Sequence, residues 1–249
     1  MEQKNDYNIN SLIKSLNILE ELIEHDEMSI LELANASGMG KSTVHRILGT
    51  FKSMGYVDQN KENSKYFPTL KIFELGTKAV NRIPLKKIVK PYLEEIFEEC
   101  HETVNFGIID KNKVIYLDKL VAAEPLRIEL EVGRRVPAYC SALGKSILAF
   151  TKDFEVSQIC FEKITENTVD SPERLLDQLK TIRKNGYAME QGEYINGLTC
   201  IAVPIKNKSN RSVAAISIAT PTIRMNDERR EAFIKLLMET VSKIGAINE

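Results

Sequence analysis

The sequence lacks an apolar run of the roughly 18–20 residues that a membrane-spanning helix requires. Its polar start, MEQKNDYNIN, also lacks the apolar stretch of a secretory signal. Hydrophobic residues make up 43% and charged residues 28% of the 249 residues, proportions that are typical of soluble globular proteins. We therefore expect a cytoplasmic protein with no membrane partner, long enough for two domains.

Metal-binding and catalytic motifs are missing as well. The four cysteines are widely separated and form no Cys-x-x-Cys pair, and the three histidines have no metal-ligand spacing. Gly-Lys-Ser occurs twice, at 40–42 and 144–146. Neither copy has the glycine that a phosphate-binding loop needs five residues earlier, because Asn35 and Tyr139 stand there. We predict no enzymatic activity, no metal and no cofactor.

Charge is nearly balanced overall, with a formal net charge of −1, but it is unevenly distributed. Residues 40–92 hold eleven Lys or Arg residues and three acidic residues, whereas acidic residues outnumber basic ones before and after this stretch. A local basic surface is enough to attract phosphate, because salt screening limits electrostatic attraction to about 10 Å. A solvated charged surface without a partner is the alternative that composition leaves open.

Residues 1–70 have the element order of a winged helix-turn-helix domain. Helical spacing predicts a first helix over 11–25. Its predicted inner residues are Leu12, Leu16, Leu19 and Ile23. Ser29 and Glu32 form a capping box for a second helix, which the glycines at 38 and 40 end. A third helix follows over 41–54, and two short strands near 56–57 and 65–67 enclose the polar turn NKENS.

The third helix has an outward side that suits the major groove of double-stranded DNA. Its spacing turns apolar residues such as Val44 and Leu48 inward. Free amides and the helix dipole at its start attract phosphate, and side chains one turn later can reach base edges. The predicted DNA contacts are Ser29, Lys41, Ser42, Thr43, His45, Arg46, Lys61 and Lys65.

Two interpretations of this domain stay open. The first is sequence-specific binding to an operator, and the second is a small-molecule sensor whose winged helix is a protein-interaction module. The basic stretch favours DNA, and a steep fall of binding with rising salt would separate the two.

The remainder of the chain predicts an α+β domain. A helix with Thr69 as its N-cap connects the two halves, and Pro84 and Pro91 predict a bend or a new helix start. Strand patterns follow over 102–110, 114–121, 126–132, 186–194, 198–206 and 212–220. Helical patterns lie between them and at the end, which predicts an antiparallel sheet of the GAF or profilin-like kind with one face free to form a ligand pocket.

The run GKSTVHRILGTFKSMGYV, a polar wing and the run KIFELG together resemble the IclR family of bacterial transcriptional regulators. The C-terminal half also keeps the spacing of the family signature, at Gly186, Glu190, Glu193, Cys200-Ile201-Ala202, Ile205 and Asn207. Two positions depart, since Glu190 stands where Asp or Ser is usual and Lys206 where an aromatic residue or His is usual. The resemblance spans almost the whole chain.

The resemblance implies a winged helix-turn-helix DNA-binding domain (1–70), a linker helix (71–84) and an effector-binding and oligomerisation domain (85–249). It implies a homodimer or tetramer that regulates transcription, with repression favoured over activation. Carried over by position, the effector-binding residues are Ala142, Leu143, Glu190, Cys200 and Ser217. Helix-start amides can hold a carboxylate, and Glu190 accepts hydrogen bonds from hydroxyl groups. The expected effector is a small organic acid, with a sugar acid favoured over an aromatic acid.

Overall fold

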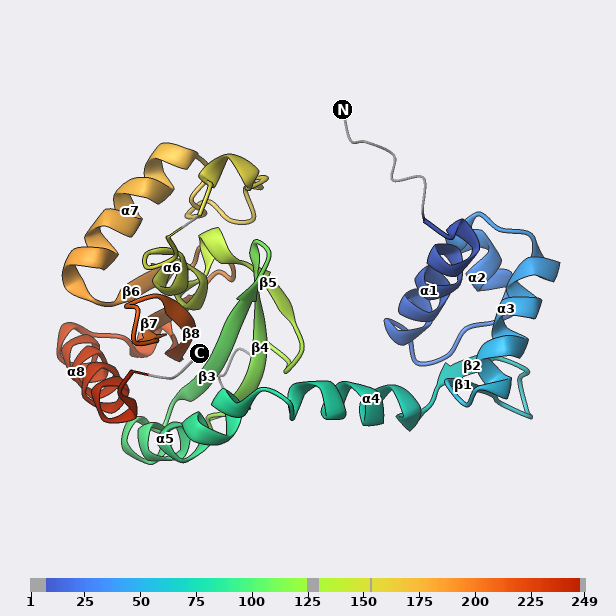
Figure 1. The fold of residues 1–249 in the computed structure, drawn as a ribbon, viewed down its shortest axis with the longest axis horizontal. Coiled ribbons are helices and arrows are strands. Elements are labelled where there is room, and N and C mark those ends of the chain that lie inside the picture. Colours follow the sequence, from blue (N-terminus) through green and yellow to red (C-terminus); the bar gives the residue numbers. More distant parts are fainter. Residues whose placement is uncertain (1–7, 125–129, 153, 247–249) are drawn as a thin grey trace. The chain divides into compact units, whose positions relative to one another are not determined.

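The computed structural model describes residues 8–124, 130–152 and 154–246 (Figure 1). It divides into an N-terminal unit, Met1–Arg82, and a C-terminal unit, Ile83–Glu249. The connector helix, α4 (Leu70–Val80), falls within the N-terminal unit.

The N-terminal unit is a winged helix-turn-helix. Its elements are α1 (Asn10–Ile23), α2 (Ile30–Ser37), α3 (Lys41–Ser53), β1 (Val57–Gln59) and β2 (Tyr66–Pro68). The two strands pair antiparallel, which makes the hairpin of the wing. Ile18, Leu22, Leu33, Val44 and Leu48 are fully buried and hold the three helices together. The predicted fold of this part is confirmed.

Helix α1 faces its core with a different side from the one predicted. Ile18, Leu19 and Leu22 are buried, whereas Leu12, Leu16 and Ile23 are 54%, 44% and 43% exposed. The prediction was wrong because apolar residues occupy two adjacent stripes of this helix, and spacing alone does not rank them. Leu12 and Leu16 instead line an apolar groove of about 850 Å³ between α1 and α3.

Helix ends follow the predicted caps. Ser29 and Glu32 form the complete capping box of α2, which ends at Gly38 in the left-handed conformation. The Thr69 side chain accepts a hydrogen bond from the Lys71 amide and caps α4. Phe73 of α4 is 71% exposed.

The C-terminal unit is built on one six-stranded sheet with the order β5-β4-β3-β8-β7-β6. The strands are β3 (Thr103–Asp110), β4 (Lys113–Leu120), β5 (Arg135–Pro137), β6 (Ala188–Gln191), β7 (Leu198–Lys206) and β8 (Ser212–Pro221). Every neighbouring pair is antiparallel, as predicted. The predicted strand over 126–132 falls mostly outside the described residues, and 130–132 are not in a strand.

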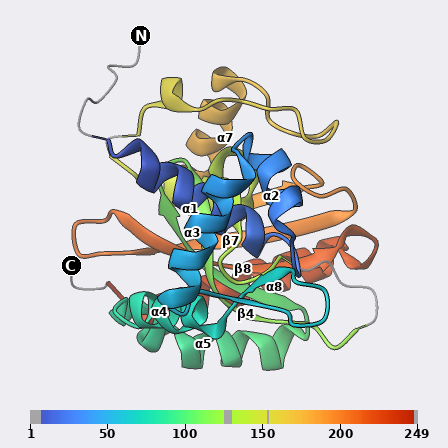
Figure 2. The same ribbon diagram turned by 90° about the vertical axis from the view of Figure 1, so that its right-hand side faces the viewer.

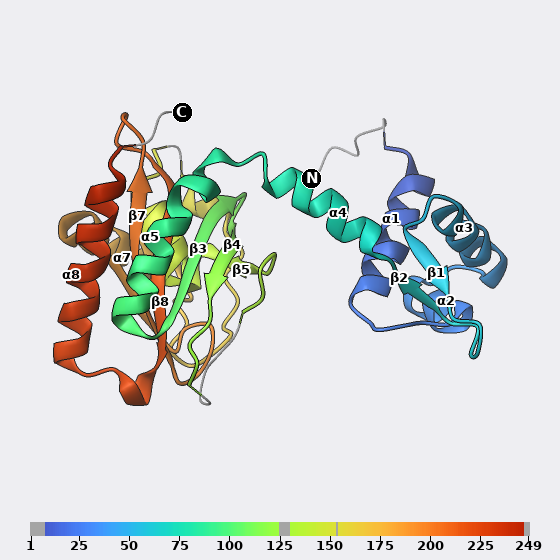
Figure 3. The same cartoon turned by 90° about the horizontal axis from the view of Figure 1, so that it is seen from below.

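Helices cover both faces of the sheet. On one face lie α5 (Pro84–Cys100) and α8 (Asp227–Ile244), which pack side by side (Figure 3). The other face carries α6 (Ala142–Leu148), with α7 (Pro172–Asn185) packed on it, so that α5 and α7 lie on opposite sides of the sheet (Figure 2). Pro84 is the first residue of α5, and Pro91 lies inside this helix. Short 3-10 turns, η1 (Ala138–Cys140), η2 (Val156–Gln158) and η3 (Thr222–Arg224), complete the unit.

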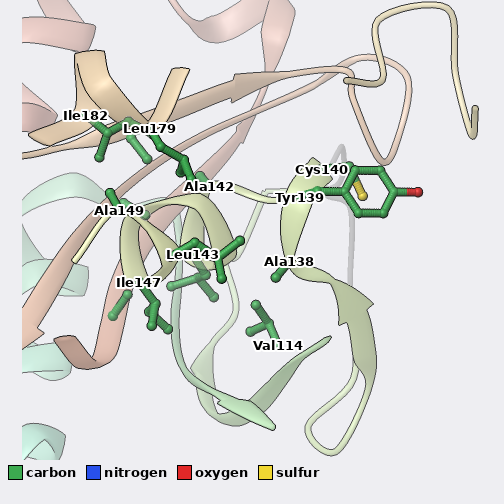
Figure 4. Close-up of a cluster of buried hydrophobic side chains, with 14 of the residues drawn as sticks. Val114, Ala138, Tyr139, Cys140, Ala142, Leu143, Ile147, Ala149, Leu179 and Ile182 are labelled. Atoms are coloured by element: carbon green, nitrogen blue, oxygen red, sulfur yellow. The ribbon is translucent and has the colours of Figure 1, made fainter. Parts of the chain in front are cut away.

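Small residues bring α6 unusually close to its neighbours. A Cβ atom on Gly144 would lie 2.3 Å from the carbonyl oxygen of Ala138, a separation that backbone atoms do not tolerate. The sheet offers Ala202 and Ala215 to the same buried cluster. Figure 4 shows Leu143 and Ile147 of α6 within this cluster, with Ala138 and Val114 nearby. Helix α6 is therefore packed closely against η1 and the sheet.

Candidate functional site

The outer side of α3 is polar and accessible. Lys41, Ser42, Thr43, His45 and Arg46 are all exposed. Val44 and Leu48 of the same helix are fully buried. One side of the helix is therefore packed in the core, and the opposite side is open to solvent. The structure thus brings five of the eight predicted DNA contacts onto one accessible helix surface.

The wing is attached to the rest of the unit by a hydrogen-bonded carboxylate that sequence reasoning missed. Glu27 accepts hydrogen bonds from the side-chain amides of Asn60 and Asn63. Lys61 is exposed at the tip, and the Lys65 ammonium lies 3.6 Å from a carboxylate oxygen of Glu32. The signal was present in the sequence only as two asparagines in a turn, which do not indicate a partner 33 residues or more away.

Ser29, a predicted DNA contact, also has a structural role as the N-cap of α2. Its hydroxyl accepts a hydrogen bond from the Glu32 amide (3.2 Å), and Glu32 Oε2 accepts one from the Ser29 amide (2.7 Å). Ser29 therefore starts α2, and contact of this residue with DNA stays a prediction.

The five predicted effector residues come together around one enclosed cavity, although they are up to 75 positions apart in the sequence. The cavity is lined by Tyr116, Leu130, Val136, Ser141, Ala142, Leu143, Glu190, Tyr194, Leu198, Cys200 and Ser217. Its volume is about 10 Å³, enough for about one water molecule. Tyr116 of β4 and Tyr194 of the segment after β6 are aromatic wall residues that were not predicted from the sequence.

Glu190 is the acidic group of this cavity. It is 3% exposed, lies directly across from Cys200 in the β6–β7 pair, and accepts a hydrogen bond from the Glu193 amide at 2.9 Å. Burial raises the pKa of Glu190 to about 7, although the Glu193 amide and the Lys145 ammonium act to lower it. The Glu190 carboxyl therefore keeps its proton to a higher pH than an exposed glutamate does.

Ser217 lies on the same side of the sheet. It is opposite Asn105 in the β3–β8 pair, and the Asn105 amide donates a hydrogen bond to its hydroxyl oxygen at 3.3 Å. Both side chains are buried. The hydroxyl hydrogen of Ser217 remains chemically suited to donate to an oxygen atom of a ligand.

A buried ion pair lies behind the cavity. The Lys145 ammonium, on α6, is fully buried and lies 2.5 Å from Glu193 Oε1 and 2.9 Å from Gln178 Oε1. In the sequence, Lys145 stands out only within a Gly-Lys-Ser run that lacks phosphate-loop spacing, and Glu193 only as a signature position. The pairing of the two was not predicted.

The start of α6 forms another part of the wall. Ser141 Oγ caps the helix by accepting a hydrogen bond from the Gly144 amide at 3.1 Å. Ala142 and Leu143 follow the cap directly and are buried against the cavity. Burial also raises the pKa of the nearby Cys140 thiol to about 12, which makes it a poor nucleophile at neutral pH.

Within the described ranges, no group of three or more His, Cys, Asp or Glu side chains is arranged to hold a metal ion. The described helices also include none that is long and apolar enough to cross a membrane.

Comparison with known proteins places the chain in a family. Residues 77–246 match the family model described as "Bacterial transcriptional regulator IclR C-terminal", and residues 11–61 match "IclR helix-turn-helix domain". The chain is 37% identical over 242 residues to the HTH-type transcriptional regulator KdgR of Escherichia coli, covering 96% of this chain and 92% of that protein. It is 30% identical to the transcriptional repressor IclR of Escherichia coli, covering 95% and 89%.

A solved structure shares the fold. An IclR homologue from Microbacterium hydrocarbonoxydans, complexed with 4-hydroxybenzoate, superposes with a TM-score of 0.80 at 21% identity, covering 94% of this chain and 97% of that one. The family and these relatives are transcriptional regulators, which confirms the prediction of a non-enzyme. The chain belongs to the IclR family and is a DNA-binding transcriptional regulator.

Proposed function

We propose that this regulator is a repressor that binds a partly palindromic operator as a homodimer or tetramer and responds to a small organic acid, with a sugar acid favoured. One observation carries the proposal: five residues from α6, β6, β7 and β8 enclose a single cavity in the C-terminal unit. The 30% identical relative named as a transcriptional repressor supports repression.

The exposed side of α3 supports the DNA-binding half of the proposal. Arg46 is exposed one turn into α3, and we expect it to reach base edges. Lys41 and Ser42 are exposed at the start of the helix, where we expect phosphate contacts. The lysines of the wing add phosphate contacts on the flanking backbone. Each neutralised phosphate steepens the fall of affinity with salt, which a protein-interaction module would not show.

The test of this half is operator binding by the Arg46→Ala variant, with DNA fragments selected from a random pool. A lost base contact costs about 1–3 kcal/mol, or roughly ten- to a hundred-fold in affinity, and relaxes sequence preference at one position. Arg211→Ala is the matched control, because Arg211 is an exposed arginine of the C-terminal unit. Equal affinities of the Arg46 variant and the control would contradict the assignment of α3.

The cavity supports the effector half of the proposal. Its walls combine apolar side chains with few polar groups, namely Glu190, Ser217, Ser141 and the two tyrosines, as small-molecule sites commonly do. Hydroxyl groups of a sugar acid find acceptors and donors there. The 4-hydroxybenzoate complex of the structural neighbour supports an organic acid as the ligand class.

The closed form of the cavity suggests how a ligand acts. At about 10 Å³ it is far smaller than a sugar acid, so lining side chains must move apart when one binds. A ligand that binds only the opened form shifts the protein toward that form. A thermal-shift screen with D-gluconate, D-galacturonate, D-glucuronate and 4-hydroxybenzoate tests this half, since a ligand at 100 times its Kd stabilises by about 2.7 kcal/mol. Stabilisation by none of these acids would contradict the proposed ligand class.

A further inference from the structure

The charges around the cavity do not balance when an acid binds. Three charged side chains are buried there, the carboxylates of Glu190 and Glu193 and the ammonium of Lys145. Among the residues that the structure describes, Lys145 is the one buried base in this group. Before any ligand arrives, the fully ionised group already carries one excess negative charge.

The Lys145 ammonium is paired with the Glu193 carboxylate and not with Glu190. It lies 2.5 Å from Glu193 Oε1 and also donates to Gln178, whereas Glu190 is held by the Glu193 amide and faces the Cys200 thiol. Glu190 is at the cavity wall, and Glu193 is behind it. An acid effector in this small cavity therefore lies close to the Glu190 carboxyl, and no buried cation of the described residues is free to balance both charges.

Two carboxylates close together within a buried site do not both stay ionised, and one of them takes up a proton. We infer that the cavity binds its acid effector together with one proton from solvent, which is held on the Glu190 carboxyl. The inference rests on the proposed function, in which the effector is an organic acid. The total charge of Glu190, Glu193, Lys145 and the bound effector then equals the charge of the three side chains before binding, because one anion and one proton enter together.

The surroundings of Glu190 are consistent with an easily acquired proton. The titratable groups that face it are the Cys200 thiol of β7, the Cys140 thiol of η1, the Tyr116 hydroxyl of β4, the Tyr194 hydroxyl and the Glu193 carboxyl after β6, and the Lys145 ammonium of α6. On α7, Arg174 acts on Glu193 from an exposed position, where it is paired with Asp170. Burial outweighs the cation and holds the pKa of Glu190 at about 7, so protonation near neutral pH costs little.

The inference defines how affinity depends on pH. Above pH 7 the free protein has lost the Glu190 proton and must recover it to bind, so the apparent Kd rises about tenfold for each pH unit. Well below pH 7 the proton is already present and the Kd becomes constant. A neutral ester or amide of the same acid needs no added proton and should show no such slope.

The experiment is calorimetric titration of the full-length protein with each acid of the panel above between pH 6 and 8.5, in buffers of different ionisation enthalpy. We expect uptake of about one proton at pH 8.5 and a Kd that rises about tenfold per pH unit above 7. In Glu190→Gln, whose amide imitates the protonated acid, we expect a Kd that changes less than about twofold over this range. Glu98→Gln, an exposed glutamate of α5, is the matched control and should keep the wild-type slope.

A ligand-free measurement keeps the inference testable by itself. Carboxyl carbon NMR of the ligand-free protein, with the Glu190 signal identified by its absence in Glu190→Gln, should show a proton lost near pH 7. A Glu190 signal that titrates near pH 4.5 overturns the inference whichever acids bind. Acid binding without proton uptake, or with the same slope in Glu190→Gln, overturns the inference and leaves the proposed function standing. Binding of none of the acids at pH 6 overturns both.

Discussion

Replacing Lys145 by Met tests how the buried ion pair contributes to the C-terminal unit. Met keeps most of the apolar stem but leaves the Glu193 carboxylate buried without its cation, and Glu193 Oε2 already has no hydrogen-bond partner among the described residues. Breaking such a pair costs about 3–5 kcal/mol. The most protected amides of this unit should then exchange with solvent roughly a hundred- to several-thousand-fold faster.

The loss should depend on pH, because the variant leaves Glu193 free to titrate. Burial raises the pKa of Glu193 above 4.5, and Lys145 acts to lower it, so removing Lys145 raises the pKa further. A carboxyl whose pKa is raised in the folded state keeps its proton better when folded. The contribution of Glu193 to the stability of the variant is therefore most favourable below about pH 4.5 and is lost as the pH rises through its folded-state pKa.

The assay is hydrogen exchange with mass spectrometry on the full-length protein, because a chain of two units does not unfold in a single two-state step. Lys163→Met is the matched control, since it breaks an ion pair with the 91% exposed carboxylate of Glu166, and such pairs contribute about 0–1 kcal/mol. The reasoning is refuted if Lys145→Met exchanges no faster than this control. It is also refuted if its deficit is the same at pH 5 and pH 8.

Three further predictions concern packing, thiol chemistry and the wing. Gly144→Ala should destabilise the C-terminal unit by about 1–3 kcal/mol, seen as a lower melting temperature, because the new methyl group would overlap the Ala138 carbonyl. A thiol reagent at pH 8 should modify the exposed Cys160 first, whereas Cys140 should react only on unfolding because burial raises its pKa to about 12; equal rates would contradict this. Glu27→Ala should speed amide exchange in the wing through the loss of two hydrogen bonds worth about 1 kcal/mol each, and unchanged exchange would show that the wing is held by other contacts.

Local signals made most of the fold predictable. Ser29, Thr69, Ser171 and Asn226 each cap the helix that starts after them, because a short polar side chain there satisfies an amide of the first turn. Pairing between distant strands was not readable in the same way. The β3–β8 pair joins Asn105 to Ser217 across more than a hundred residues, and the alternation of side chains indicates a strand without naming its neighbour.

The cavity residues that match positions of the family could be predicted from the sequence. The contacts that depend on how the helices and the sheet pack could not. Glu190, Cys200 and Ser217 were selected through the resemblance, and the structure gathers them at one cavity. The partnership of Lys145 with Glu193 could not be selected, because a lysine in a helical segment is usually solvated. In the structure α6 packs tightly, with Gly144 against the Ala138 backbone of η1, and the Lys145 ammonium is buried beside that carboxylate.

The tight packing of α6 also affects how a ligand enters the cavity, because the start of α6 is part of the cavity wall. The sheet contributes alanines to the cluster that packs around α6, and the start of this helix forms part of the cavity wall. On the proposed function, a cavity with room for about one water molecule accepts an organic acid only when its lining side chains move apart. Part of that lining belongs to the densely packed start of α6, and densely packed elements move between discrete arrangements instead of deforming gradually. A regulator needs such a discrete change, because an effector controls DNA affinity only if it binds the two arrangements with different free energies.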